Sequence, residues 1–126
     1  MRLFSRGLND VTASLPTVVA AVGALDADDV VLDGETLAVD EQGRPRRFQD
    51  TMSGLDATAA FFFDLLHVDG RSLIDDPLTV RKSVLHDLVP STLVLPSIET
   101  DDGALADRFA DDAVTAGHEG VVVKAL

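Results

Sequence analysis

The sequence predicts a fold that mixes strands and helices in packed layers, an α/β or α+β sandwich. Apolar, strand-like runs over 30–39 and 61–67 alternate along the chain with segments whose apolar residues recur at helical spacing. Turn signals such as Val68-Asp69-Gly70 end these runs. With 126 residues, 46% of them hydrophobic and 25% charged, the chain has the balance of at most one globular domain with a real core.

A first helix is expected near Pro16, a residue that suits the first turn of a helix. Ser14 is expected to cap it, because a serine hydroxyl can accept hydrogen bonds from the free N–H groups of the first turn. Val18, Val22 and Leu25 then recur at helical spacing and should share one apolar face.

Two further helices are expected in the second half of the chain. One opens at Asp76-Pro77 and runs to about Leu88, where Pro90 stops it. The other is capped by Asp101 or Asp102. Its expected inward residues and C-terminal signal are Leu105, Phe109 and Gly117.

Short apolar segments predict the strands. The segment at 93–98 contains a proline and is therefore expected at a sheet edge. Because the chain starts and stops on expected strands, the sequence suggests a piece of a larger sheet. The expected strands are Arg2–Ser5, Val30–Val39 (followed by a turn at 40–43), Phe61–His67, Leu93–Ile98 and Glu119–Lys124.

Charge and composition exclude several classes of function. The net charge of −12, with 22 acidic against 10 basic residues, predicts poor DNA binding by this chain alone, because phosphate neutralisation needs a basic face. The absence of cysteine excludes disulfides and thiolate metal sites and suits a cytoplasmic location. No apolar run approaches the roughly 20 residues that span a bilayer, so no membrane partner is expected.

Two acidic segments carry the first hint of chemistry. Asp33-Gly34-Glu35 alone reads as a bulged strand with solvated acids, and Glu119-Gly120 is equally unspecific. However, both glutamates stand beside a glycine, within or at the start of an apolar strand. Such a placement aims a carboxylate at a pocket while the glycine permits close backbone approach. By contrast, the three histidines are too scattered to predict a metal site.

Three segments together resemble signature segments of ATP-dependent DNA ligases, within the covalent nucleotidyltransferase superfamily. They are 31–40, 61–70 with its Phe-Asp-Leu-Leu-x-x-Asp-Gly pattern, and 118–124 with Glu-Gly-Val-Val-Val-Lys. The stretch 2–12 is similar to the strand and loop after the family's nucleophile motif. The resemblance implies an ATP-grasp-like α+β nucleotidyltransferase core of antiparallel sheets and helices. It also implies that residues 1–126 are a partial adenylation domain, with no separate DNA-binding domain or OB-fold.

The resemblance also implies roles for individual residues. Arg6 would contact the nucleotide or the nick phosphate, Glu35 would bind the ATP ribose or approach a metal, and Lys124 would lie near the triphosphate. Phe63 would stack on adenine, and Glu119 would coordinate Mg²⁺. The plainer interpretations are a surface arginine, solvated acids and a core phenylalanine.

The run of three phenylalanines leaves the stacking residue open between Phe61 and Phe63. Arg44, Arg46 and Arg47 form the one basic cluster of the sequence, by default a surface loop, which could meet the DNA backbone in a full enzyme.

The nucleophile expected from the family is absent from this sequence. The motif Lys-x-Asp-Gly-x-Arg does not occur, and the only lysines are Lys82, within an expected helix, and Lys124. The final Lys-x-Lys motif is also absent. We therefore expect no catalytic nucleophile in this chain and no activity from it alone. The implied parent enzyme uses ATP and Mg²⁺ to seal nicked duplex DNA in repair, replication or recombination, with the missing ligase domains as partners.

Two alternatives stay open at this point. One is a related nucleotidyltransferase, such as an RNA ligase or a capping enzyme, although the segment 61–70 favours a DNA ligase. The other is a noncatalytic, truncated remnant with weak nucleotide binding, which the missing lysine favours for the chain as given.

Overall fold

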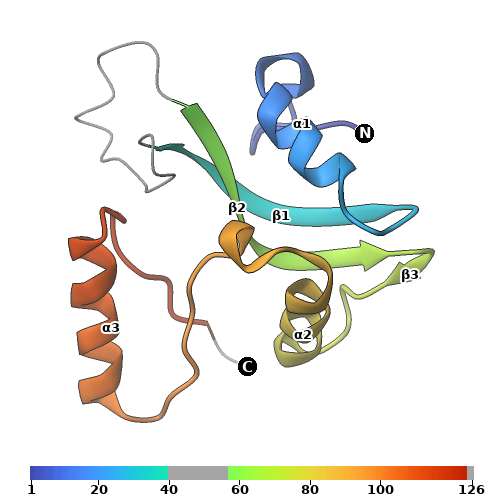
Figure 1. Cartoon of the computed structure of the whole chain (residues 1–126). Coiled ribbons are helices and arrows are strands. Elements are labelled where there is room, and N and C mark those ends of the chain that lie inside the picture. Colours follow the sequence, from blue (N-terminus) through green and yellow to red (C-terminus); the bar gives the residue numbers. More distant parts are fainter. Residues whose placement is uncertain (40–56, 125–126) are drawn as a thin grey trace.

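The computed structural model describes residues 1–39 and 57–124 (Figure 1). A three-stranded antiparallel sheet has the order β1-β2-β3, and helices accompany it, so the α+β class is confirmed. The strands are β1 (Val30–Val39), β2 (Ala57–Val68) and β3 (Arg71–Ser72). The helices are α1 (Pro16–Gly23), α2 (Leu78–Leu88) and α3 (Gly103–Thr115), with 3₁₀ turns η1 (Thr12–Ser14) and η3 (Ser91–Leu93).

The long pair β1–β2 contains two register shifts, and the one nearer its middle is a bulge at Phe63. Gly34 pairs with Phe62 and the preceding Asp33 pairs with Asp64, so Phe63 is an extra residue on β2 without a partner on β1. A bulge of this kind bends the strand and redirects the side chains around it. The bulge therefore changes which face of the sheet the side chains after Phe62 occupy.

Gly34 lies unusually close to β2. A Cβ atom at this position would lie 2.7 Å from the carbonyl oxygen of Phe61 and 2.8 Å from Cδ1 of Phe62. Backbone and ring atoms leave no room for a side chain, so the glycine is required by the strand pairing. The expectation that this glycine permits close backbone approach is confirmed.

The core lies between β2 and the helices α1 and α2 (Figure 1). Val18 of α1 is buried there, and Val22 and Leu25 pack against it in part, as the helical spacing predicts. The buried members of this core are Val18, Ala60, Phe62, Leu65, Leu73, Leu85, Val89 and Val94.

The ends of the helices largely follow the sequence signals. The second expected helix is α2, which ends at Leu88 ahead of Pro90. Asp102 caps α3, where its Oδ1 accepts hydrogen bonds from the backbone N–H groups of Ala104 (2.9 Å) and Leu105 (3.4 Å). These two assignments are confirmed.

The expected cap of α1 is wrong. Pro16 is the first residue of the helix, but Leu15 occupies the capping position and makes no side-chain cap. Ser14 instead ends the 3₁₀ turn η1, where its backbone N–H donates to Val11 O at 3.0 Å. The serine lies one position too early because that turn sits directly before the helix.

The expected inward face of α3 is also wrong. No residue of α3 is buried, and Leu105 remains 40% exposed while Phe109 is half-buried. Figure 1 shows α3 to the side of the sheet, away from α1 and α2. The amphipathic spacing predicts the helix correctly, but the described residues place no core beneath it.

Three expected strands are not strands among the described residues. At 2–5 only Phe4 forms a bridge, with Asp10. At 93–98 the chain forms η3 and one parallel bridge from Val94 to Phe62, after which Leu95 N donates to Phe62 O at 2.8 Å. Pro96 has no N–H with which to continue that ladder. The segment 119–124 has no ladder in the described part of the chain.

Two expectations lie outside the described residues: the turn at 40–43 and the basic cluster of Arg44, Arg46 and Arg47.

Candidate functional site

Phe63 and Lys124 lie together, although 60 positions of sequence separate them. The Nζ atom of Lys124 lies 4.9 Å from the centre of the Phe63 ring, within the range of a cation–π interaction. Phe63 is the unpaired residue of the β2 bulge and is only partly buried. The structure thus brings together the residue expected to stack on adenine and the residue expected near the triphosphate.

The neighbouring Phe61 has a different environment. It is only 8% exposed and stands opposite Glu35 in the β1–β2 register. A ring so deeply buried offers little surface to a ligand, whereas the Phe63 ring is partly accessible. Of the two rings, Phe63 is therefore the more accessible one.

Asp64, the residue after the bulge, forms a buried ion pair that the sequence alone did not reveal. Its Oδ1 and Oδ2 accept hydrogen bonds from Nε (2.8 Å) and Nη2 (3.0 Å) of Arg81 on α2. The Asp64 side chain is only 10% exposed. Because an unpaired buried charge is costly, a fork-to-fork pair is the arrangement that can place these groups here.

The ionisation of Asp64 reflects opposing influences. Burial alone would raise the pKa of its carboxyl, but hydrogen bonds from Arg81 and from Leu65 N, and the charges of Arg81 and Lys124, lower it below the ordinary 3.8. In turn, the hydrogen bonds to Asp64 raise the pKa of Arg81. Both groups are charged at neutral pH, and Lys124 lies close enough to contribute.

A sequence signal for this pair did exist. Asp64 interrupts an apolar run at 61–66, and an acid within a buried strand needs a cationic partner. Arg81, early in the helix after the turn, was a candidate for that partner. The spacing alone did not select it over other arginines.

The other expected site residues are exposed and separate. Glu35 lies on β1, Arg6 in the turn of the N-terminal hairpin, and Glu119 in the segment after α3. Within residues 1–39 and 57–124, no group of three or more acidic or histidine side chains is arranged to hold a metal. Mg²⁺ commonly binds through one or two carboxylates plus substrate phosphates, so a single exposed carboxylate such as Glu119 is compatible with that mode.

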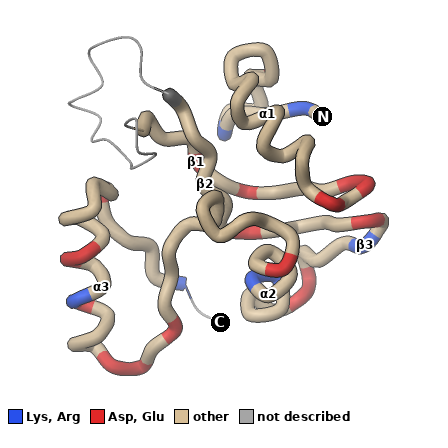
Figure 2. The backbone as a smooth tube through the Cα atoms, in the orientation of Figure 1, with Lys and Arg blue, Asp and Glu red and all other residues tan. Residues whose placement is uncertain are grey.

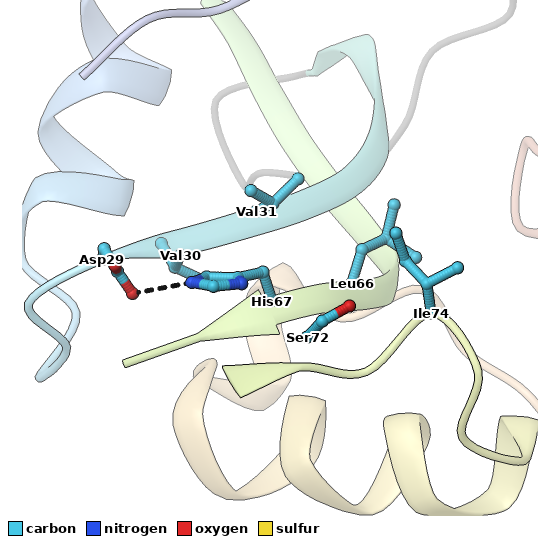
Figure 3. A pocket seen from close by; sticks show the side chains of 7 residues that line it. All are labelled: Asp29, Val30, Val31, Leu66, His67, Ser72 and Ile74. Carbon is cyan, nitrogen blue, oxygen red and sulfur yellow. Dashed lines mark hydrogen bonds and ion pairs between the residues drawn. The ribbon is translucent and has the colours of Figure 1, made fainter. Parts of the chain in front are cut away.

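A hollow of about 420 Å³ lies elsewhere on the sheet (Figure 3). It sits where β1 begins and β2 ends, beside β3, and His67 Nε2 approaches Asp29 Oδ1 there at 3.1 Å. None of the expected site residues lines it. Its lining consists of Asp29, Val30, Val31, Leu66, His67, Ser72 and Ile74. The hollow is therefore distinct from the Phe63–Lys124 pair.

Charges are distributed unevenly over the described backbone. Figure 2 shows acidic positions along α3 and at the loops, whereas the basic positions are scattered rather than gathered on one face. Each helix in the described part of the chain is too short or too polar to cross a bilayer.

The whole sequence, residues 1–126, matches the model of the ATP-dependent DNA ligase domain. The chain belongs to this family. Similar curated proteins include a probable DNA ligase of Pseudarthrobacter chlorophenolicus, 47% identical, and one of Beutenbergia cavernae, 50% identical. The alignments cover 100% and 99% of this chain but 26% of each relative, so the chain spans about a quarter of the length of these ligases.

Solved ligase structures share the fold. A mycobacterial DNA ligase D complexed with ATP and MES is 30% identical and aligns with a TM-score of 0.67 over 94% of this chain and 39% of that one. The ligase domain of M. tuberculosis LigD is 27% identical, with a TM-score of 0.67 over 91% of this chain and 37% of that one. Membership of the DNA ligase family thus has support from both sequence and structure.

Proposed function

We propose that this chain is part of the adenylation domain of an ATP-dependent DNA ligase, which seals nicks through enzyme–AMP and DNA–adenylate intermediates. The observation that carries the proposal is the meeting of Phe63 and Lys124, with a partly accessible ring beneath an ammonium group. An aromatic face and a cation are the groups needed for a purine and a phosphate chain. The ATP in the similar ligase D structure agrees with this choice of nucleotide.

In the proposed complex, adenine stacks on the face of Phe63 that Lys124 covers in the free chain, and the ammonium moves to the phosphates. Glu35 accepts a hydrogen bond from the ribose, and Arg6 contacts a phosphate. Glu119 supplies one carboxylate to Mg²⁺, whose charge would assist the departure of pyrophosphate. These assignments distribute base, sugar, phosphate and metal over separate segments of the chain.

The chemistry needs a lysine that attacks the α-phosphorus of ATP. Lys124 is assigned to the phosphates, and Lys82 lies on α2 with its Nζ 3.6 Å from Glu99 Oε1. We therefore propose that the 126-residue polypeptide alone forms no lysyl-AMP. In the whole enzyme, other segments supply the nucleophile and grip nicked duplex DNA, because this acidic chain lacks the charge for that task. The reaction is placed in the cytoplasm, where ATP and DNA are both available.

Saturation-transfer NMR with ATP and Mg²⁺ tests the stacking assignment. Saturating the phenylalanine rings of the chain should transfer magnetisation to the adenine protons, and Phe63→Leu should abolish the transfer. Phe4→Leu is a matched control, since Phe4 is an exposed ring of the N-terminal hairpin that contacts Arg2. Equal transfer in the Phe63→Leu chain would refute the assignment. We expect weak ATP binding, because the chain spans only about a quarter of the length of the ligases that it matches, and a low-micromolar affinity would contradict that expectation.

Incubation with α-labelled ATP tests the absence of a nucleophile. The purified chain should carry no label after denaturing electrophoresis. A covalently labelled band would show that a residue of this chain accepts AMP and would overturn that part of the proposal.

A further inference from the structure

Arg81 uses its whole guanidinium group to connect α2 with the β2 bulge. Nε and Nη2 donate to the two oxygens of Asp64 at 2.8 and 3.0 Å, and Nη1 donates to the backbone oxygen of Asp76 at 2.7 Å. The Arg81 side chain is only 18% exposed. A planar fork fixes the direction of the carboxylate as well as its position, which a lysine ammonium would not.

The fixed carboxylate lies directly beside the candidate site. Asp64 follows Phe63, the residue without a partner on β1, and its Oδ1 also accepts a hydrogen bond from Leu65 N at 2.9 Å. Arg81 therefore restrains the backbone immediately after the bulge. Because the extra residue of a bulge is not held by the strand ladder, its direction depends on such neighbouring restraints.

Lys124 approaches the same short segment of β2. It lies over the Phe63 ring, and its charge is felt at the Asp64 carboxylate. The Phe63 ring and the Asp64 carboxylate, at adjacent positions on β2, thus both attract the ammonium group of Lys124.

We propose that Arg81 is a positioning residue: through Asp64 it sets the direction of the Phe63 ring, which is the platform for the base and on which Lys124 rests until the nucleotide binds. The inference rests on the proposed function, in which Phe63 receives adenine. Arg81 itself touches neither the base nor the phosphates.

The chain offers a direct spectroscopic test because it contains only two lysines, Lys82 and Lys124. With ¹³C-labelled lysine, the Hε protons of Lys124 should show an upfield ring-current shift, while Lys82 serves as the internal reference. We compare Arg81→Gln with Arg71→Gln. Arg71 is also an arginine paired with an aspartate, but its pair with Asp76 is exposed.

In the Arg81→Gln chain, Lys124 should lose most of its upfield shift, and the ATP affinity should fall about five- to tenfold. Arg71→Gln should change neither. A merely structural role would lower the urea midpoint of Arg81→Gln but leave the Lys124 resonance of the folded molecules in place. That result, or an equal effect of Arg71→Gln, would overturn the proposal.

The experiment distinguishes failure of the Arg81 proposal from failure of the proposed function. If the unmodified chain fails to bind ATP at Phe63, the proposed function fails, while the Lys124 resonance without nucleotide still decides the role of Arg81. If Arg81→Gln does not fold, Asp64→Asn gives the same reading, because it preserves the volume of the side chain and removes the forked ion pair. An unchanged Lys124 resonance in folded Asp64→Asn would then contradict the proposal.

Discussion

The molecule divides into a central region, residues 16–39 and 57–95, and two terminal segments, residues 1–15 and 96–124. Every buried residue of the described chain lies in the central region. Both parts contain elements that the sequence signals correctly, such as α2 in the first and α3 in the second. Local signals therefore predict where a helix forms, whereas burial depends on which neighbours are present to cover it.

The terminal segments contribute no buried residue, although Leu3 and Leu15 pack against the core. In the first of them, Asp10 accepts hydrogen bonds from Thr12 and pairs with Arg2. The second reaches the central region where Lys124 covers the Phe63 ring. The candidate site thus combines a ring fixed by the well-packed region with a cation from a segment that contributes no buried residue, which suits a group that must move when a ligand binds.

The largest expected effect comes from truncating matched leucines in the two regions. Leu85→Ala should reduce the free energy of unfolding by about 2–5 kcal/mol, because this α2 side chain is 1% exposed in the core. Leu105→Ala in α3 should cost less than about 1 kcal/mol, since that side chain is 40% exposed. Urea unfolding measures both. Comparable losses would mean that α3 packs as firmly as α2 and would contradict the contrast in burial between the two regions.

A somewhat smaller effect is expected from Gly34→Ala on β1. The new methyl group would overlap Phe61 O and the Phe62 ring, and overpacking of this kind costs about 1–3 kcal/mol. Gly23→Ala is the control, because a Cβ at this last residue of α1 meets nothing within 4 Å. It should be neutral or stabilising by up to about 1 kcal/mol. Thermal unfolding that ranks the two variants in the opposite order would contradict the observed strand pairing.

Helix capping gives the third prediction. Asp102→Ala should destabilise α3 by about 1 kcal/mol, because it removes the acceptor for two N–H groups of the first turn. The change should appear as faster amide hydrogen exchange within α3, with the exchange of β2 unaltered. Ser14→Ala should leave α1 unchanged, since that serine is not its cap. Faster amide exchange in α1 of the Ser14→Ala chain would instead show that Ser14 caps this helix, as the sequence suggested.

The smallest expected effect concerns acid pH and the N-terminal segment. Hydrogen bonds from the Thr12 side chain and backbone, and then from Arg2, lower the pKa of Asp10 from 3.8 to about 2. Because the pKa in the folded chain lies below its unfolded value, the contribution of Asp10 to stability is present above pH 3.8 and is lost as the pH falls towards 2.

Carboxyl ¹³C titration of Asp10 measures this shift directly. Thr12→Val should raise the midpoint towards 3.8, because it removes the strongest donor. A midpoint that stays near 2 in that variant would assign the shift to the backbone N–H of residue 12 and to Arg2 instead.

Periodicity and caps predicted most of the central fold. The bounds of β1 and the end of α2 follow from residues whose preferences agree with their surroundings. The wrong predictions depend on residues far from the segment concerned or on the turn beside it. They are the cap at Ser14 and the strands at 93–98 and 119–124. A strand forms only where another strand pairs with it, and the sequence of 119–124 does not show whether such a partner is present.

The candidate site was predictable only in part. The resemblance to DNA ligases predicted that Phe63 and Lys124 belong to the nucleotide site, and the structure places the two side chains in contact. The pair of Asp64 and Arg81 is set by the connection from β2 through β3 to α2, which brings an early residue of the helix back onto the strand. The sequence therefore shows that an acidic residue lies within a buried strand, but it does not show which arginine pairs with it.

The most direct test of the proposed nucleotide site is a titration of the ¹³C-lysine-labelled chain with ATP and Mg²⁺. If adenine takes the ring face that Lys124 covers, the Hε resonance of Lys124 should move downfield as it leaves the ring, while that of Lys82 stays in place. Saturation of the shift with ATP, and its loss in Phe63→Leu, would agree with the account. A Lys124 resonance that does not respond to millimolar ATP, or one that moves no further than Lys82, would contradict it.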